Sequence, residues 1–205
     1  YADHFPYLQK KTARGVRRTP FHHHLKENGA VFGELAGWER ANWFANPGQD
    51  PSYAYSWKRQ NFFDNVAAEH KAVRSNLGLY DMSSFGKIRV EGPDACAFMN
   101  YIGGGQYDVP LGKIVYTQFL NDRAGIEADV TVTRLSETCY LVVSPAATRL
   151  ADQTWMMRHK GAFNVVITDV TAGEAVLAVM GPNARKLLER VSPNDFSNAH
   201  NPFGT

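Results

Sequence analysis

The chain has 205 residues, of which 44% are hydrophobic and 20% are charged, a composition typical of a globular protein with one domain or one and a half. Its formal net charge of +2 is too small to indicate binding to nucleic acid or to an anionic membrane surface. No apolar run approaches the ~20 residues needed to span a bilayer, so we expect no membrane segment.

Residues 1–60 differ in character from the rest of the chain. They are rich in Gly, Pro and aromatic residues and show little periodicity. Because disordered segments are poor in aromatic residues, we expect an ordered but irregular segment that packs on a following domain, residues 61–205. The chain opens at Tyr1 without Met and closes on NAHNPFGT without a completed element. We therefore expect that domain to be incomplete at its C-terminus.

Three consecutive histidines, residues 22–24, raise the question of a metal site. Adjacent histidines cannot all converge on one ion in helix or strand geometry, and no carboxylate follows at a metal-like spacing. We expect structural or surface roles for them and no metal site.

From residue 61 onward the hydrophobic pattern becomes regular. Helical stripes and strand-like alternation, punctuated by Gly and Pro, follow one another. Helices are predicted over 61–78, 93–104, 145–161 (with Ser144 as N-cap) and 182–191, and strands over 87–92, 112–120, 126–135, 139–144, 164–171 and 174–181. Residues 121–125 predict a five-residue hairpin loop. This order predicts an α+β fold, mainly an antiparallel sheet with flanking helices.

A short internal similarity joins two of these segments. VEGPDACAFM at 90–99 matches VMGPNARKLL at 179–188, and each reads as a strand, a Gly-Pro turn and a helix. One interpretation is a common strand-to-helix turn met twice. The other is a pair of related α+β units.

Asp129 stands out in the strand 126–135. Alternation sends Ala128, Val130 and Val132 to one face and Asp129 to the other, although Asp is depleted in strands. It could face water or pair with Arg134. Alternatively, it is a carboxylate held at a ligand site, where it would accept a hydrogen bond or stabilise a cation. Tyr116, thirteen residues earlier on the partner strand, would lie near the same face.

Two further segments are interpreted structurally. GGGQYDVPLGK at 103–113 lacks the spacing of a phosphate-binding loop and predicts a flexible connection. GLYDMSSFGK at 78–87 carries Asp81, Ser83 and Ser84, which favour local side-chain bonds and a turn.

Three stretches together resemble the folate-binding domain of the glycine-cleavage T-protein (aminomethyltransferase) family. They are GLYDMSSFGKIRVEGPDACAFM, GKIVYTQFLNDRAGIEADVTVTRL and YLVVSPAAT. The family's DvSHmG turn corresponds to residues 81–86, its Gly…Tyr strand to 112–116, and its GGi-DD stretch to 124–129. The sequence departs from the pattern where Ala128 replaces the first Asp and where SSF replaces SHM. The opening TPFHHHLKENGAVFGELAGWERANWF resembles the segment before this domain in dimethylglycine and sarcosine dehydrogenases.

Residue by residue, the resemblance implies a folate site. Asp129 falls on the family's catalytic aspartate, beside the reactive nitrogens of tetrahydrofolate. Tyr116 falls on a folate-pocket tyrosine, and Phe85 falls where the family has the Met that lines the pterin site. Thr133 and Ser144 fall near further positions of the pocket.

The resemblance also implies a larger parent protein. It would be a flavoprotein whose FAD domain oxidises an N-methylated amine, and whose folate domain passes the one-carbon unit to tetrahydrofolate as 5,10-methylene-tetrahydrofolate. FAD would belong to the parent and not to these residues, which contain no Gly-rich flavin motif. The implied compartment is the cytoplasm in a bacterium or the mitochondrial matrix in a eukaryote.

A non-catalytic alternative comes from the same resemblance. The architecture is similar to that of a regulatory subunit of pyruvate dehydrogenase phosphatase, so an interaction module is the second hypothesis.

Overall fold

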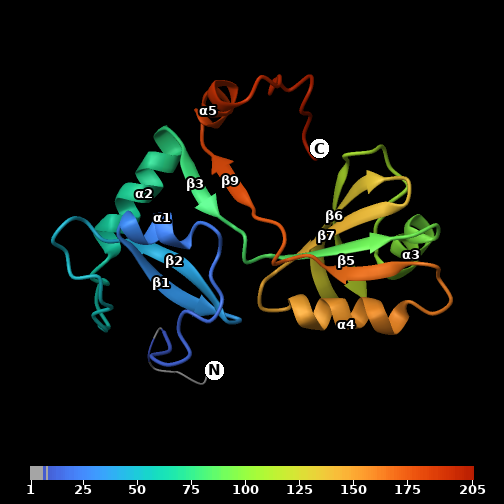
Figure 1. The fold of residues 1–205 in the computed structure, drawn as a ribbon, viewed down its shortest axis with the longest axis horizontal. Coiled ribbons are helices and arrows are strands. Elements are labelled where there is room, and N and C mark those ends of the chain that lie inside the picture. The colour runs from blue at the N-terminus through green and yellow to red at the C-terminus, as the bar shows by residue number, and fades with distance from the viewer. Residues whose placement is uncertain (1–6, 8) are drawn as a thin grey trace. The chain divides into compact units, whose positions relative to one another are not determined.

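The computed structural model describes residue 7 and residues 9–205 (Figure 1). It divides into two compact units. The first holds the described residues up to Ser84 together with Ala175–Phe196, and the second holds Phe85–Glu174 with Ser197–Thr205. The first unit is therefore discontinuous in sequence, and most of the second unit lies between its two segments. This division differs from the expected single boundary at residue 60.

A five-stranded antiparallel sheet forms the centre of the second unit. Its strand order is β5-β6-β7-β4-β8, and every pairing within it is antiparallel. The strands are β4 (Gly86–Glu91), β5 (Ile114–Leu120), β6 (Ile126–Ser136), β7 (Cys139–Ser144) and β8 (Val166–Asp169). The predicted α+β class with a mainly antiparallel sheet is confirmed.

One face of this sheet is the core of the unit. Helices α3 (Ala95–Ile102) and α4 (Arg149–His159) pack on it, and Figure 1 shows α4 running along the sheet. Strand alternation supplies the apolar partners. The buried side chains include Ile88, Val90, Val130, Val132 and Val142 from the strands and Phe98, Met99 and Met156 from the helices.

The β5–β6 hairpin closes through residues 121–125, the loop length that the sequence predicts. The Asn121 side-chain oxygen accepts the backbone N–H groups of Arg123 (3.0 Å) and Gly125 (2.8 Å). Asn side chains shape turns in this way. The loop fixes the register that sets which side chains face each other across the hairpin.

The glycine-rich connection 103–113 is anchored rather than flexible. Tyr107 is fully buried, donates its hydroxyl to Thr117 Oγ1 (2.8 Å) and accepts the hydroxyl of Tyr140 at its carbonyl oxygen (2.9 Å). A Cβ at Gly103 would overlap the Tyr107 hydroxyl, so the absence of side chains here makes room for the buried ring.

Helix α4 begins later than predicted. Residues 145–148 form a turn closed by the backbone bond from Thr148 N to Pro145 O (3.2 Å), and Thr148 occupies the N-cap position instead of Ser144. Ser144 is the last residue of β7, where it pairs with Gly86.

The first unit contains regular elements where an irregular segment was expected. They are α1 (His22–Glu27) and the antiparallel hairpin of β1 (Ala30–Leu35) and β2 (Trp38–Phe44). Helix α2 (Phe63–Ser75), also in the first unit, lies within the range 61–78 where a helix was predicted. The hairpin buries Trp38 and Trp43. Because aromatic residues dominate this packing, the segment shows little of the aliphatic periodicity that predicts strands.

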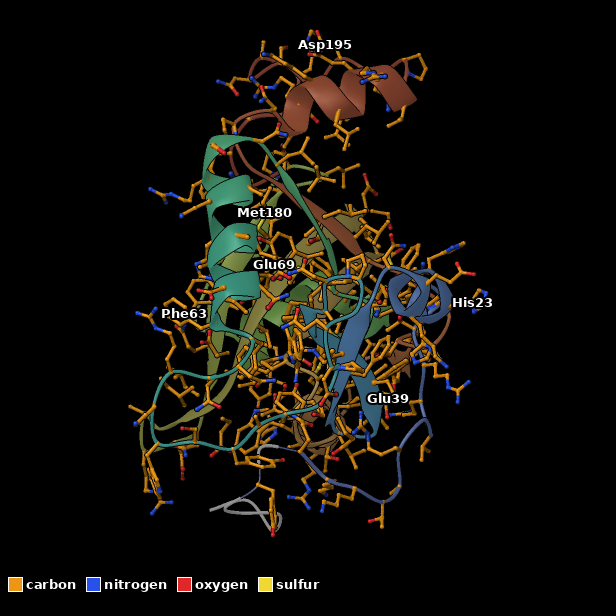
Figure 2. The ribbon with its side chains drawn as sticks, turned by 90° about the vertical axis from the view of Figure 1, so that its left-hand side faces the viewer. His23, Glu39, Phe63, Glu69, Met180 and Asp195 are labelled. Atoms are coloured by element: carbon orange, nitrogen blue, oxygen red, sulfur yellow. The ribbon has the colours of Figure 1, made fainter. Side chains whose placement is uncertain are left out.

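A buried ion pair ties the start of the described chain to this hairpin. Glu39, on β2 and labelled in Figure 2, is 5% exposed and accepts two bonds from Arg14, at 2.8 and 2.6 Å. The Gly15 amide donates a third, at 2.6 Å. The Arg14 bond, above all, lowers the pKa of Glu39, against the opposing effect of burial.

The first unit ends in a separate two-stranded ribbon. Strand β3 (Gly78–Asp81) pairs antiparallel with β9 (Leu177–Met180), and α5 (Ala184–Val191) follows β9 directly. Strand β3 occupies part of the segment predicted to be a turn; Ser83 and Ser84 lie in the turn that follows it.

Candidate functional site

The β5–β6 hairpin presents a polar face on the side of the sheet opposite the core. On β6, Ala128, Val130 and Val132 are buried, whereas Asp129 is exposed, as the alternation predicts. On β5, Tyr116 and Gln118 point to this same side. Gln118 lies directly opposite Asp129, and Tyr116 lies opposite Thr131.

Two side chains hold the Asp129 carboxylate. The Tyr116 hydroxyl donates to Oδ2 at 3.0 Å, and the Gln118 amide donates to Oδ1 at 3.2 Å. Arg134, which the sequence suggested as a partner, bonds instead to Asp108 (2.7 Å) and to the Val109 carbonyl oxygen (2.7 Å). Asp129 is thus oriented by neutral donors, and neither of these two bonds brings a cation to its negative charge.

The carboxylate changes the acidity of its tyrosine neighbour. The pKa of Tyr116 is raised, first because its hydroxyl donates to Asp129, then by desolvation and by the negative charge itself. Tyr116 is 67% exposed, so its ring face is open to a ligand. A carboxylate oxygen has more than one lone pair, and each oxygen here uses one for its tyrosine or glutamine donor. Asp129 therefore retains capacity to accept a hydrogen bond from a bound molecule.

Thr133 continues the same polar face. It lies opposite Ile114 and four residues from Asp129, which is roughly 13 Å along the strand. Thr131 lies between them. A ligand that contacts both Asp129 and Thr133 must therefore extend along the hairpin.

Ser144 lies on the opposite face of the sheet. It shares the core side of β7 with Tyr140 and Val142 and is 1% exposed. A Cβ at Gly86 would lie 2.6 Å from the Ser144 Oγ and 2.7 Å from the Cγ of Arg149 in α4. The structure therefore does not bring Ser144 together with Asp129, because the sheet separates them.

Phe85 immediately precedes β4 and is half-buried. Strand β7 separates β4 from β6 in the sheet. Two strand spacings are roughly 10 Å, so we expect the Phe85 backbone to lie about that far from β6. Phe85 therefore lies on the same sheet as the hairpin face but does not belong to the hydrogen-bonded group around Asp129.

Gln118 is a site residue that the sequence interpretation missed. The sequence could have indicated it, because Gln118 lies two residues from Tyr116 and residues two apart on a strand share a face. The direct opposition of Gln118 to Asp129 depends on the register, which the five-residue loop and the irregularity between Phe119 and Leu120 set together.

The three histidines lie on or beside the surface, as expected. His23 and His24 approach Glu27 at 3.1 and 3.6 Å on the exposed side of α1, and His22 stacks on Phe32. Figure 2 shows His23 at the outer side of this helix. In residue 7 and residues 9–205, no group of three or more His, Cys, Asp or Glu side chains could hold a metal ion. Over the same residues, no helix has the length and apolar character needed to cross a bilayer.

The fold and the hairpin face define an α+β domain with an exposed, oriented carboxylate. The model of the GCVT N-terminal domain family matches residues 21–205, and the chain belongs to this family.

Two curated relatives are similar to nearly the whole chain. It is 49% identical over 197 residues to 4-methylaminobutanoate oxidase (formaldehyde-forming) of Paenarthrobacter nicotinovorans. It is 29% identical over 198 residues to the mitochondrial dimethylglycine dehydrogenase of Homo sapiens. These matches cover 96% and 94% of this chain but 24% and 22% of those proteins, so the chain spans about a quarter of their length.

A solved structure agrees with the fold. The glycine cleavage system aminomethyltransferase T of Bartonella henselae superposes with a TM-score of 0.71 at 27% identity. The match covers 85% of this chain and 43% of that one.

Proposed function

We propose that this chain is the folate-binding, one-carbon-accepting part of a flavoprotein that oxidises an N-methylated amine. The observation that carries the proposal is the Asp129 carboxylate, held by Tyr116 and Gln118 on an otherwise open polar face. The family membership and the names of the two oxidising relatives, whose substrates are N-methyl amines, support the same assignment.

Asp129 has the properties needed at the reacting centre. Transfer of a one-carbon unit to a reduced folate requires a folate nitrogen to attack a cationic carbon and lose its proton. A carboxylate beside that nitrogen accepts its hydrogen bond and stabilises the neighbouring positive charge. A positioned group of this kind contributes roughly 10²- to 10⁴-fold in rate.

Tyr116 and Gln118 are positioning residues in this proposal. Their two hydrogen bonds hold both oxygens of the carboxylate, so one orientation is favoured before the ligand arrives. The exposed Tyr116 ring offers a flat surface on which an aromatic part of folate can stack. Thr133 would contact the ligand farther along the strand, and Phe85 would line the pterin side.

The flavin would be held by another part of the parent protein and would supply the two-electron oxidation of the amine. The residues of this chain would then receive the one-carbon unit at the oxidation level of formaldehyde. By analogy with the relatives, the parent would act in the bacterial cytoplasm or in the mitochondrial matrix of a eukaryote.

Binding of a reduced folate tests the site directly. We would titrate 5-formyl-tetrahydrofolate calorimetrically into this chain and into a protein extended in frame beyond Thr205. Asp129→Asn should weaken binding by about ten- to a hundredfold, because a charge-assisted hydrogen bond is worth roughly 1.5–3 kcal/mol. The matched control is Asp122→Asn, which changes an exposed carboxylate in the loop of the same hairpin and should leave binding unchanged.

The fate of the one-carbon unit tests the chemistry. The name of the 49% identical relative specifies formaldehyde as its product, which favours release of formaldehyde when no folate accepts the unit. In the parent protein, added tetrahydrofolate should divert product from formaldehyde to 5,10-methylene-tetrahydrofolate, and Asp129→Asn should reduce that diversion about 100-fold. Equal diversion by both variants would remove Asp129 from the reaction. No folate binding to either protein would favour the non-catalytic interaction module.

A further inference from the structure

A cavity of about 430 Å³ opens at the loop end of the β5–β6 hairpin, within the size range of small-molecule sites. Its walls come from the end of α3, the end of α4 and the hairpin loop. Its lining includes Tyr101, Ile102, Leu120, Asp122, Trp155 and His159. Helices α3 and α4 cover the face of the sheet opposite Asp129, so this cavity is separate from the proposed folate site.

The charged side chain on the cavity wall is a carboxylate. Within residue 7 and residues 9–205, the exposed Asp122 carboxylate has neither a hydrogen-bond nor an ion-pair partner. Arg123, Arg158 and Lys160 are neighbours in sequence of lining residues, but they do not line the cavity. An unpaired carboxylate that no Lys or Arg of the lining neutralises favours a cationic ligand.

Two helix ends add to this negative potential. Tyr101 and Ile102 are the last two residues of α3, and Trp155 and His159 lie one turn apart at the end of α4. The carbonyl groups at the C-terminal end of a helix carry partial negative charge and favour a cation nearby. Helix α3 has no basic residue in its last turn to offset that charge.

His159 contributes a hydrogen-bond acceptor. Its Nδ1 lies 2.8 Å from the carbonyl oxygen of Trp155. A carbonyl oxygen can only accept, so in the neutral ring Nδ1 carries the proton and Nε2 keeps its lone pair. His159 Nε2 and the Asp122 carboxylate are therefore two acceptors from residues of one cavity. A ligand that satisfies both needs two N–H donors.

Much of the remaining lining is aromatic or aliphatic. The ring centroids of Trp155 and His159 are 4.0 Å apart, and Tyr101 is 62% exposed. Ile102 and Leu120 add aliphatic surface. Aromatic faces attract cations, and the indole of Trp does so most strongly. This lining suits an ammonium group with a hydrocarbon part better than a hydrated inorganic cation.

We propose that this cavity binds a primary or secondary alkylammonium ion that carries no carboxylate. The ammonium N–H groups would donate to Asp122 and to His159 Nε2, and the alkyl part would lie against the aromatic and aliphatic lining. A carboxylate on the ligand would be repelled by Asp122, and no Lys or Arg lines the cavity to hold it. This binding function is independent of whether the chain binds folate.

Three ligands of nearly the same shape test the chemistry. N-methylbutylammonium has a charge and two N–H groups, butyl methyl ether has neither, and 4-methylaminobutanoate has both but ends in a carboxylate. Each would be titrated into the chain at fixed ionic strength, with the Trp155 indole followed by NMR. N-methylbutylammonium should bind about tenfold more tightly than the other two.

Three results of this titration would overturn the proposal. One is the absence of N-methylbutylammonium binding. Another is equal binding of the ether, because the cavity would then recognise only apolar surface. The third is binding of 4-methylaminobutanoate as tight as that of N-methylbutylammonium, because the ligand would then be a zwitterion.

Substitutions in the lining test the assigned roles. Asp122→Asn removes the charge and should weaken N-methylbutylammonium binding about tenfold. Tyr101→Leu removes an aromatic face and should weaken it about threefold. Both residues are exposed, so the melting temperature should stay nearly unchanged. The matched control Glu137→Gln changes an exposed carboxylate between β6 and β7 and should not affect binding. Undiminished binding by Asp122→Asn would contradict the proposal.

Folate binding separates this proposal from the proposed function. Asp122→Asn should lose affinity for N-methylbutylammonium and keep its affinity for 5-formyl-tetrahydrofolate, because the two ligands occupy different faces of the sheet. Loss of both affinities would mean that they share one site and would overturn the separate cavity. The amine titration needs no folate, so a failure of folate binding leaves its result intact.

Discussion

Asp129 lies directly opposite Gln118 in the β5–β6 ladder, whereas Tyr116, opposite Thr131, reaches the same carboxylate along a diagonal. Diagonal neighbours across an antiparallel pair are ordinarily too distant for short side chains and within reach of aromatic ones. The length of the tyrosine is therefore what brings two donors to one carboxylate.

Tyr116→Phe removes one of these donors and keeps the ring. We expect reduced-folate binding to weaken by up to about tenfold, because a net hydrogen bond contributes about 0.5–1.5 kcal/mol. The melting temperature should not change, since Tyr116 is largely exposed. Tyr101→Phe, which removes an exposed hydroxyl from α3, is the matched control for calorimetry, and equal binding by both variants would exclude a positioning role for Tyr116.

The ionisation of Tyr116 reports on its contact with Asp129. Its pKa is raised chiefly by donation to that carboxylate, so the contact persists below the ordinary tyrosine range and is lost as the pH rises through the raised pKa. Asp129→Asn should lower the pKa of Tyr116 toward its ordinary value, whereas Asp122→Asn should not. Carbon NMR of labelled tyrosine measures the titration, and an unmoved Tyr116 would mean that the contact is not formed in solution.

Ser144→Ala should leave folate binding unchanged. Ser144 is buried on the helix-covered face, and the sheet separates it from Asp129. The affinity of this variant for 5-formyl-tetrahydrofolate, compared with that of Asp129→Asn, distinguishes the two faces. A loss of affinity comparable to that of Asp129→Asn would require the ligand to reach the helix side of the sheet.

Glu39→Gln should destabilise the first unit by about 2 kcal/mol, the range for a hydrogen bond to a charged group. The Arg14 bond lowers the pKa of Glu39, so its stabilising contribution is present above the ordinary glutamate range and is lost as the pH falls through the lowered pKa. Urea unfolding from pH 7 to pH 3 should therefore show a smaller acid-dependent loss in the variant. Parallel curves for the two proteins would mean that the pair contributes nothing.

Gly92→Ala and Gly181→Ala should each destabilise by about 2 kcal/mol or more, because both positions combine positive φ with an overlap against an asparagine carbonyl oxygen. Gly48 has φ of 80°, and a methyl group added there would meet nothing within 4 Å, so Gly48→Ala should cost only about 1 kcal/mol. Thermal unfolding of the three variants measures the difference. Equal costs would mean that backbone conformation alone, without the asparagine contact, sets the requirement for glycine.

The parts of the fold that were predictable from sequence are those with a regular period. Ala128, Val130 and Val132 alternate cleanly, so β6 and the exposure of Asp129 followed from the pattern. The hairpin β1–β2 was missed because it is held by Trp38, Trp43 and the Glu39 ion pair rather than by aliphatic alternation.

The site residues that depend on alternation within one strand could be predicted from the sequence. Those that depend on how two strands pair could not. Tyr116 and Asp129 were both named from the sequence, and the structure brings them into contact. Gln118 needed the register of two strands. The resemblance placed Ser144 near the site, but Ser144 is the last residue of β7 and lies on the other face of the sheet. It is two and four residues from Val142 and Tyr140, so strand alternation puts it on the same buried face as those residues.

The interrupted path of the chain affects how the protein is made. Gly78 of β3 pairs with Met180 of β9, and nearly the whole second unit lies between them in the sequence. At roughly 5–20 residues per second, a ribosome takes about 5–20 seconds to synthesise the hundred or so residues between them. During that time the second unit can fold with all the strands of its sheet already present, while β3 emerges without a partner. In a nascent chain, β3 would therefore remain unpaired after the sheet of the second unit has formed. Chaperones that bind extended apolar segments could bind β3 before β9 is synthesised.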